Sequence, residues 1–90
     1  MYRKLVRTKN FIKDHSKVKW TDQHYTKFII YIGKLLEKDI LPPEAIDHQL
    51  KGEWADFREF HISGDLLVVY HIDEDIIYLT RIGTHSQIFG

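Results

Sequence analysis

FREFHISGDLLVVYHIDEDIIYLTRI, residues 57–82, is the stretch of sequence that decides the fold. It contains three runs rich in branched and aromatic residues, 57–62, 66–72 and 76–82, and such runs are typical of β-strands. Ser63-Gly64-Asp65 and Asp73-Glu74-Asp75 separate the runs and are suited to tight turns. The middle run is apolar almost throughout, as in a strand covered on both faces. We therefore expect a meander of three antiparallel strands.

The clearest helix of the chain is expected between residues 21 and 36. Thr21 or Asp22 caps its start, and Pro42-Pro43 prevents its continuation. Apolar side chains recur every three or four residues and so share one helical face: Tyr25, Phe28, Ile29, Ile32, Leu35 and Leu36. This face is expected to pack on the sheet as part of the core, not to hold a cofactor.

A short strand and a shorter helix are expected before it. Residues 2–6 mix aromatic, basic and branched side chains and suit an edge strand, available as a fourth strand of the sheet. Thr8 is a suitable N-cap for a helix over residues 9–17 with a narrow apolar stripe. Together these elements predict an α+β fold, with two N-terminal helices packed on a small twisted antiparallel sheet, in a single domain spanning residues 1–90.

Composition favours a cytoplasmic protein. Cysteine is absent, which excludes disulfides and thiolate metal sites. The N-terminus lacks the apolar segment of a signal peptide, and no run reaches membrane-spanning length. The chain is neutral overall, but residues 1–20 carry seven lysines and arginines against one aspartate, a net charge of +6. Such a segment can bind a polyanion, although a solvated helix face is the simpler explanation.

Several polar residues are expected to meet at one end of the sheet. Residues 41–54 form a linking loop, with at most one helical turn near 44–47, and this loop carries His48 and Lys51. His61 ends the first strand of the meander, Asp65 lies in the following turn, and His85 follows the third strand. Antiparallel connectivity brings these positions to the same end of the sheet. The remaining histidines are expected to be structural or isolated: His15, His24 and His71.

Cleavage of RNA through its own 2′-hydroxyl would use such a group. Histidines suit the roles of general base and general acid, because they titrate near neutral pH. Asp65 could orient one of them, Arg81 could hold the phosphate, and Phe89 could stack on a base. No metal is required for this reaction.

Simpler interpretations of the same residues remain open at this stage. Asp65 could be only a turn residue, and Arg81 could pair with Asp73 or Asp75 at the surface. Phe89 could close the core, and Trp54 and Phe57 are expected to lie in the core beneath the loop. A metal site is the rival use of the same polar group, although no compact ligand motif supports it: His48, His61, Asp65 and His85.

Several ordered motifs at consistent spacing carry a family resemblance. They are Leu41-Pro42-Pro43, residues 47–54 (DHQLKGEW), Phe57-Arg58-Glu59 with His61-Ile62, residues 65–70 (DLLVVY), and residues 81–86 (RIGTHS) ending in Phe89. Over essentially the whole chain, they resemble the YafQ-type branch of the RelE/ParE toxin superfamily. Phe60 departs from the pattern, since a small residue often precedes the strand histidine, and overall neutrality is unusual for a ribosome-binding toxin.

This resemblance implies a toxin of a bacterial type II toxin–antitoxin system that cuts messenger RNA in the ribosomal A site. It implies a catalytic set of His48, His61, Asp65 and His85, with His85 the leading candidate for acid or base, and no cofactor. Arg81 and Phe89 match positions that handle substrate. The remaining residues expected to contact RNA are Lys13, Lys17, Lys19 and Lys51.

The resemblance also implies partners. They are the ribosome, messenger RNA and a cognate antitoxin that neutralises the toxin, in a heterotetramer of two toxins and two antitoxins. A non-enzymatic toxin of the ParE type, which inhibits DNA gyrase, is the alternative, but that branch is not expected to carry this set of histidines. A third possibility is a chain that has lost activity and persists as a binding partner.

Overall fold

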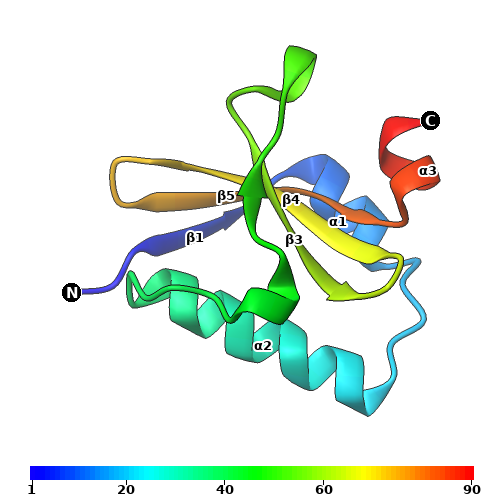
Figure 1. Cartoon of the computed structure of the whole chain (residues 1–90), viewed down its shortest axis with the longest axis horizontal. Coiled ribbons are helices and arrows are strands. Elements are labelled where there is room, and N and C mark those ends of the chain that lie inside the picture. The colour runs from blue at the N-terminus through cyan, green and yellow to red at the C-terminus, as the bar shows by residue number, and fades with distance from the viewer.

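The computed structural model describes all 90 residues, and its central element is a five-stranded sheet (Figure 1). The strands are β1 (Lys4–Arg7), β2 (His48–Gln49), β3 (Arg58–Ser63), β4 (Leu66–Asp73) and β5 (Ile76–Gly83), in the order β1-β5-β4-β3-β2. The predicted meander is present, because β3, β4 and β5 pair antiparallel. β1 differs from the expectation, since it pairs with β5 in parallel, and β2 was not expected at all.

Three α-helices and two 3₁₀ turns complete the chain. They are α1 (Lys9–His15), α2 (Asp22–Leu36), η1 (Pro43–Ala45), η2 (Gly52–Trp54) and α3 (His85–Phe89). The hydroxyls of Thr8 and Thr21 accept hydrogen bonds from backbone N–H groups in the first turns of α1 and α2, as predicted for N-caps. α1 ends two residues earlier than expected because Ser16 caps it by donating to the carbonyl of Lys13. No helix is long and apolar enough to cross a membrane.

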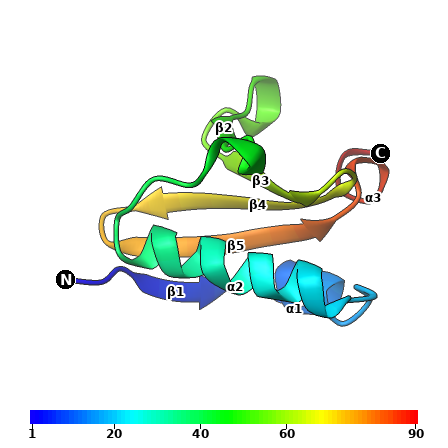
Figure 2. The same cartoon turned by 60° about the horizontal axis from the view of Figure 1, so that its bottom comes forward.

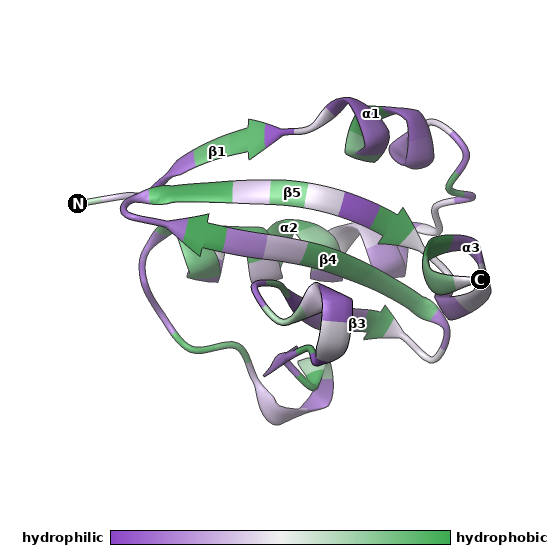
Figure 3. Ribbon diagram, turned by 90° about the horizontal axis from the view of Figure 1, so that it is seen from above, coloured by the Kyte–Doolittle hydropathy of each residue, from purple (hydrophilic) through white to green (hydrophobic).

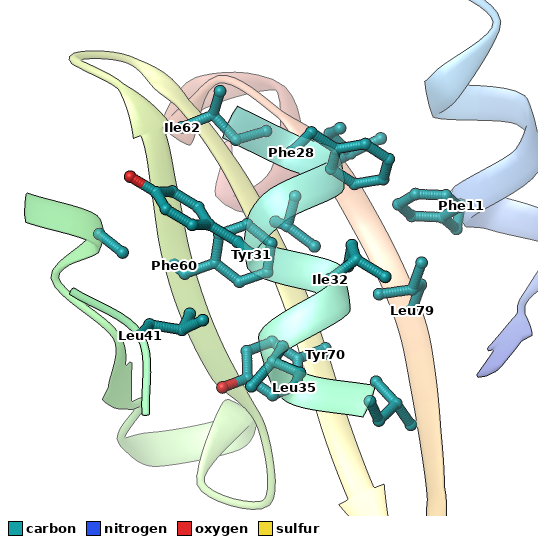
Figure 4. Close-up of a cluster of buried hydrophobic side chains, with 14 residues drawn as sticks. Phe11, Phe28, Tyr31, Ile32, Leu35, Leu41, Phe60, Ile62, Tyr70 and Leu79 are labelled. Carbon is teal, nitrogen blue, oxygen red and sulfur yellow. The ribbon is translucent and has the colours of Figure 1, made fainter. Parts of the chain in front are cut away.

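α2 covers one face of the sheet, with its axis along the strands (Figures 1 and 2). The predicted apolar stripe is partly wrong. Tyr25 and Ile29 remain about half exposed, whereas Tyr31 is buried and meets the ring of Phe60 edge-on at 5.7 Å. The contact surface of α2 is therefore rotated toward Tyr31, because Phe60 presents a large ring there. Figure 4 shows Tyr31 and Phe60 among the buried side chains between α2 and the sheet.

The opposite face of the sheet, which we call the second face, carries a smaller apolar cluster. Leu67 and Val69 of β4 are completely buried on it beneath Ile88 of α3. Side chains alternate along a strand, so these residues and Tyr70 lie on opposite faces. Figure 3 views the second face, with α2 behind the sheet and α3 at one end.

A polar network fixes the loop between α2 and β3 to the sheet. The hydroxyl of Tyr70 donates to Asp47 Oδ1 at 2.6 Å, and Arg58 Nε donates to the same oxygen at 3.3 Å. Burial, together with the hydrogen bond and charge of Asp47, raises the pKa of Tyr70 above its ordinary value. Tyr70 is therefore a neutral donor, and it holds the residue that precedes His48.

We expect Tyr70→Phe to lower the free energy of unfolding by about 1.5–3 kcal/mol, because it removes a hydrogen bond to a carboxylate. A raised tyrosine pKa stabilises the fold below the unfolded-state value of about 10 and ceases to do so as the pH rises through the folded-state value. The difference from wild type should thus persist up to about pH 10 and shrink in more alkaline solution. Urea unfolding measures it, with exposed Tyr25→Phe as the control; equal stability of both variants would contradict the network.

Candidate active site

A buried glutamate lies at the centre of the polar group. Glu59 of β3 is only 2% exposed, and its Oε2 lies 3.0 Å from His61 Nε2, 3.6 Å from His48 Nε2 and 3.7 Å from His85 Nε2. Its Oε1 is buried without a hydrogen-bond partner in the chain. A buried carboxylate is costly unless donors or positive charges surround it. His61 lies at hydrogen-bond distance from the carboxylate, and each of the three rings adds a positive charge whenever it is protonated.

Each histidine reaches Glu59 for a simple geometric reason. His61 follows it by two positions in the same strand, so both side chains point to the second face. His48 of β2 is paired directly opposite Glu59. His85 is the first residue of α3, whose start is fixed by a capping box between Thr84 and Gln87. The ring centroids of His48 and His61 are 6.4 Å apart, and those of His61 and His85 are 6.3 Å apart.

A hydrogen bond to the backbone determines which ring nitrogen of His48 carries the proton in the neutral form. Its Nδ1 lies 2.7 Å from the carbonyl oxygen of Ile46. Since a carbonyl only accepts, Nδ1 must be the donor. The Nε2 atom that faces Glu59 therefore carries a proton only when the ring is cationic. Protonation of His48 thus places a positive charge beside the buried carboxylate.

Arg81 is held by an aspartate that the sequence did not indicate. Its Nε donates to Asp14 Oδ2 at 2.6 Å, its Nη2 donates to Asp14 Oδ1 at 3.2 Å, and the backbone N–H of Ile82 also donates to Oδ2. The alternative pairing with Asp73 or Asp75 is therefore wrong. The hydrogen bond and charge of Asp14 raise the pKa of Arg81 despite the opposing effect of burial.

Asp65 does not join the histidines. It is exposed in the β3–β4 turn and has no hydrogen bond or ion pair with any of them. The carboxylate among the rings is Glu59 instead. Asp65 lines a surface cavity of about 570 Å³, which Arg81, Lys17 and Lys19 also line.

The other residues expected to contact RNA are distributed around this region. Phe89 is half-buried, with its ring 5.4 Å from His85 and 5.1 Å from Trp54. Lys51 is exposed and precedes η2. Lys13 is exposed on α1 but does not line the cavity. His71 makes no ion pair with Glu59 and packs against the rings of Phe57 and Tyr78.

Sequence reasoning missed Glu59, although a signal for it was present. A glutamate and a histidine two positions apart in an alternating strand share a face. The burial of Glu59 does not follow from the sequence pattern, because charged side chains are mostly exposed and its position opposite His48 depends on the unpredicted strand β2.

Three of these residues could also hold a metal ion. Glu59, His61 and His85 each offer one ligand atom, and these three atoms lie within 4.8 Å of one another. Two imidazoles and a carboxylate suit ions such as Zn²⁺ or Cu²⁺. This set differs from the metal site weighed from sequence, because Glu59 takes the place of Asp65. The same atoms could instead exchange protons with a substrate, as the acid and base of a catalytic site do.

Comparisons with known proteins identify the family of this chain. Residues 3–90 match the family described as bacterial toxin of type II toxin-antitoxin system, YafQ. The mRNA interferase toxin YafQ of Escherichia coli K12 is 34% identical over 62 residues, which are 67% of each chain. The chain therefore belongs to the YafQ family of type II toxins.

Solved structures share the whole fold. A copper-bound mutant toxin from Helicobacter pylori is 38% identical, with a TM-score of 0.84 over 97% of this chain and 99% of that one. YafQ in the Escherichia coli DinJ–YafQ toxin–antitoxin complex is 25% identical, with a TM-score of 0.83 over 100% of both chains. The predicted α+β class is thus confirmed.

We expect Asp14→Ala to lower the free energy of unfolding by about 2 kcal/mol, because it removes a two-pronged, mostly buried pair with Arg81. Asp75→Ala is the matched control, since the Lys38–Asp75 pair at 3.0 Å is exposed and should contribute less than about 1 kcal/mol. Urea unfolding of both variants gives the comparison. A smaller loss for Asp14→Ala than for Asp75→Ala would show that Arg81 needs no such anchor.

Proposed function

We propose that this toxin is an endoribonuclease that cuts messenger RNA on the ribosome by acid–base catalysis and so arrests translation. One observation carries the proposal: the Nε2 atoms of His48, His61 and His85 all lie within 3.0 to 3.7 Å of one buried carboxylate oxygen of Glu59. The choice of messenger RNA as the substrate is supported by the relatives that are named mRNA interferase toxins.

The reaction needs a base, an acid and a positive charge. The base removes the proton of the 2′-hydroxyl, and the 2′-oxygen then forms a bond to phosphorus. The bond from phosphorus to the 5′-oxygen breaks as the acid protonates that oxygen. The products are a 2′,3′-cyclic phosphate and a 5′-hydroxyl, and no metal ion is required.

The outer two histidines are best suited to meet the substrate. The side chains of His85 and His48 are 59% and 46% exposed, whereas that of His61 is 19% exposed. His61 lies between them and makes the shortest contact with Glu59. Glu59 thus orients the rings and stabilises the imidazolium that forms when one of them accepts a proton. Either outer ring can serve as the acid or as the base, because both face the same carboxylate oxygen at similar distances.

Arg81 is proposed to stabilise the charge that gathers on the phosphate oxygens. Asp14 occupies its Nε and Nη2 atoms, which leaves Nη1 without a partner in the chain. A guanidinium fixed on one edge and open on another is positioned without an entropic cost at the moment of reaction. The role proposed for Asp65 becomes indirect, as a wall of the cavity beside Arg81.

Binding to the ribosome is proposed to use the basic N-terminal region. Lys17 and Lys19 line the cavity beside Arg81, and Lys13 lies exposed on α1. Such contacts to ribosomal RNA weaken as salt concentration rises. Lys51 and Phe89 are proposed to contact the messenger RNA, the latter by stacking on a base next to His85.

A cognate antitoxin is the proposed protein partner, because YafQ of Escherichia coli is known in a complex with DinJ. The proposed assembly contains two toxins and two antitoxins. The proposed location is the cytoplasm, where the ribosomes are.

His85→Ala should lower the rate of cleavage of a translated messenger RNA by at least about 100-fold, because it removes an acid–base group. It should also relieve growth arrest on expression. Glu59→Gln should cause a comparable loss, since it keeps the size of the side chain and removes its charge. Purified ribosomes programmed with a defined message provide the assay, and the 3′ end is tested for a 2′,3′-cyclic phosphate.

Gln23→Ala, an exposed substitution on α2, is the control. Full activity of His85→Ala, or a plain 3′-hydroxyl at the cut, would refute the acid–base assignment.

A chelator selective for Zn²⁺ and Cu²⁺ over Mg²⁺ should leave cleavage unchanged, because protons and Arg81 are proposed to supply the catalysis. Added Cu²⁺ should instead inhibit, since it would occupy Glu59, His61 and His85. The Mg²⁺ that ribosomes need is kept constant in both arms. Loss of cleavage on chelation, with recovery on adding back one metal, would overturn the metal-independent mechanism.

A further inference from the structure

A row of five aromatic rings begins beside the histidines and crosses the second face of the sheet. In order they are Phe89, Trp54, Phe57, His71 and Tyr78. Consecutive ring centroids are 5.1, 5.2, 5.2 and 4.7 Å apart. The row is continuous with the proposed active site, because the rings of Phe89 and His85 are 5.4 Å apart.

The sheet places the far end of this row on the face opposite α2. His71 follows Val69 by two positions in β4 and therefore shares the second face with it. Tyr78 of β5 is the direct cross-strand partner of His71, and their rings stack with an interplanar angle of 11°. Trp54 ends η2 and Phe57 immediately precedes β3, so the loop brings two more rings over the same face.

These rings are not simply a second core. All five are half-buried, whereas the fully enclosed residues of this cluster are Leu67, Val69 and Ile88 beneath them. His71 also has a buried Nδ1 atom without a hydrogen-bond partner. Its ring is therefore held by aromatic contacts, face to face with Tyr78 and edge-on with Phe57, and not by polar contacts. Part of each of the five rings is left accessible at the surface.

We propose that this row is a stacking platform for the bases of single-stranded messenger RNA leading away from the cleaved bond. The inference rests on the proposed ribonuclease function and extends its site to Trp54, Phe57, His71 and Tyr78. Aromatic side chains on the uncovered face of a sheet bind unstacked bases in other RNA-binding folds. Each such contact is tolerant of sequence, because every base has a flat face.

The positions of the rings, the histidines and the basic cavity define a path for the RNA. The row extends toward the β4–β5 turn, whereas the cavity lined by Arg81, Lys17 and Lys19 lies beside the β3–β4 turn at the other end. The histidines lie between the two. RNA crossing the second face would therefore place phosphates in the basic cavity, the scissile bond at the histidines and bases on the rings. This arrangement favours RNA over an apolar peptide, which would have no use for the basic end.

The test uses a short single-stranded RNA with 2′-O-methyl groups, which cannot be cleaved, and with the fluorescent base 2-aminopurine at successive positions. Stacking quenches the fluorescence, so a titration gives both the position of stacking and Kd. We expect Tyr78→Ala to raise Kd about tenfold, as for the loss of one stacked base. Tyr78→Phe keeps the ring and should bind as wild type does.

Tyr25→Ala, an exposed tyrosine on α2, controls for loss of an aromatic ring elsewhere. Circular dichroism confirms that each variant is folded, and His71→Leu provides a second probe of the row. Unchanged Kd for both Tyr78→Ala and His71→Leu overturns the platform, as does an absence of quenching by wild type. Weaker binding of the antitoxin, with RNA binding intact, would assign the row to a protein partner and overturn the inference as well.

Failure of the platform can be separated from failure of the proposed function. If translated messenger RNA is cleaved at the wild-type rate and KM by Tyr78→Ala, the ribonuclease stands and the platform falls. If the RNA stacks on Tyr78 but no message is cleaved, the ribonuclease mechanism falls and RNA binding by the row stands.

Discussion

The site depends on one buried charge. Glu59 is enclosed on β3, and three histidines from β2, β3 and α3 converge on it. A carboxylate in that position needs donors, and imidazoles in that position need a fixed acceptor, so each side holds the other in place. Two of the histidines are carried by very short elements, the two-residue strand β2 and the five-residue helix α3.

The sequence predicts the features that depend on local patterns, but not those that depend on contacts between distant residues. Alternation and helical periodicity predicted the meander and α2, because both signals lie within short windows. The parallel pairing of β1, the Asp14–Arg81 pair and β2 join residues far apart in the chain, and no local pattern encodes them. For the site, antiparallel connectivity predicted that His61 and His85 would lie at one end of the sheet, whereas His48 reaches them through the unpredicted strand β2. The carboxylate among the rings is Glu59 and not Asp65, because strand alternation places Glu59 on the face of His61, and Asp65 lines the cavity beside Arg81 instead.

Two anchors keep the site rigid from outside it. Tyr70 reaches from the helix-covered face to hold Asp47, and thereby the loop that ends in His48. Asp14 reaches from α1 to hold Arg81 and the backbone of Ile82 on β5. Neither anchor touches the histidines. Both convert flexible segments into fixed ones, which is what acid–base chemistry between separate side chains requires.

The parallel pairing of β1 with β5 also sets the order in which the protein is made. Residues 4–7 are synthesised well before their strand partner, which lies at residues 76–79. Asp14 likewise cannot pair with Arg81, nor Glu59 contact His85, until those later residues have been synthesised. Contacts of such long sequence separation form late. A nascent chain therefore cannot assemble its histidine group until residue 85 has been made, because Glu59 lacks one of its three histidines before then.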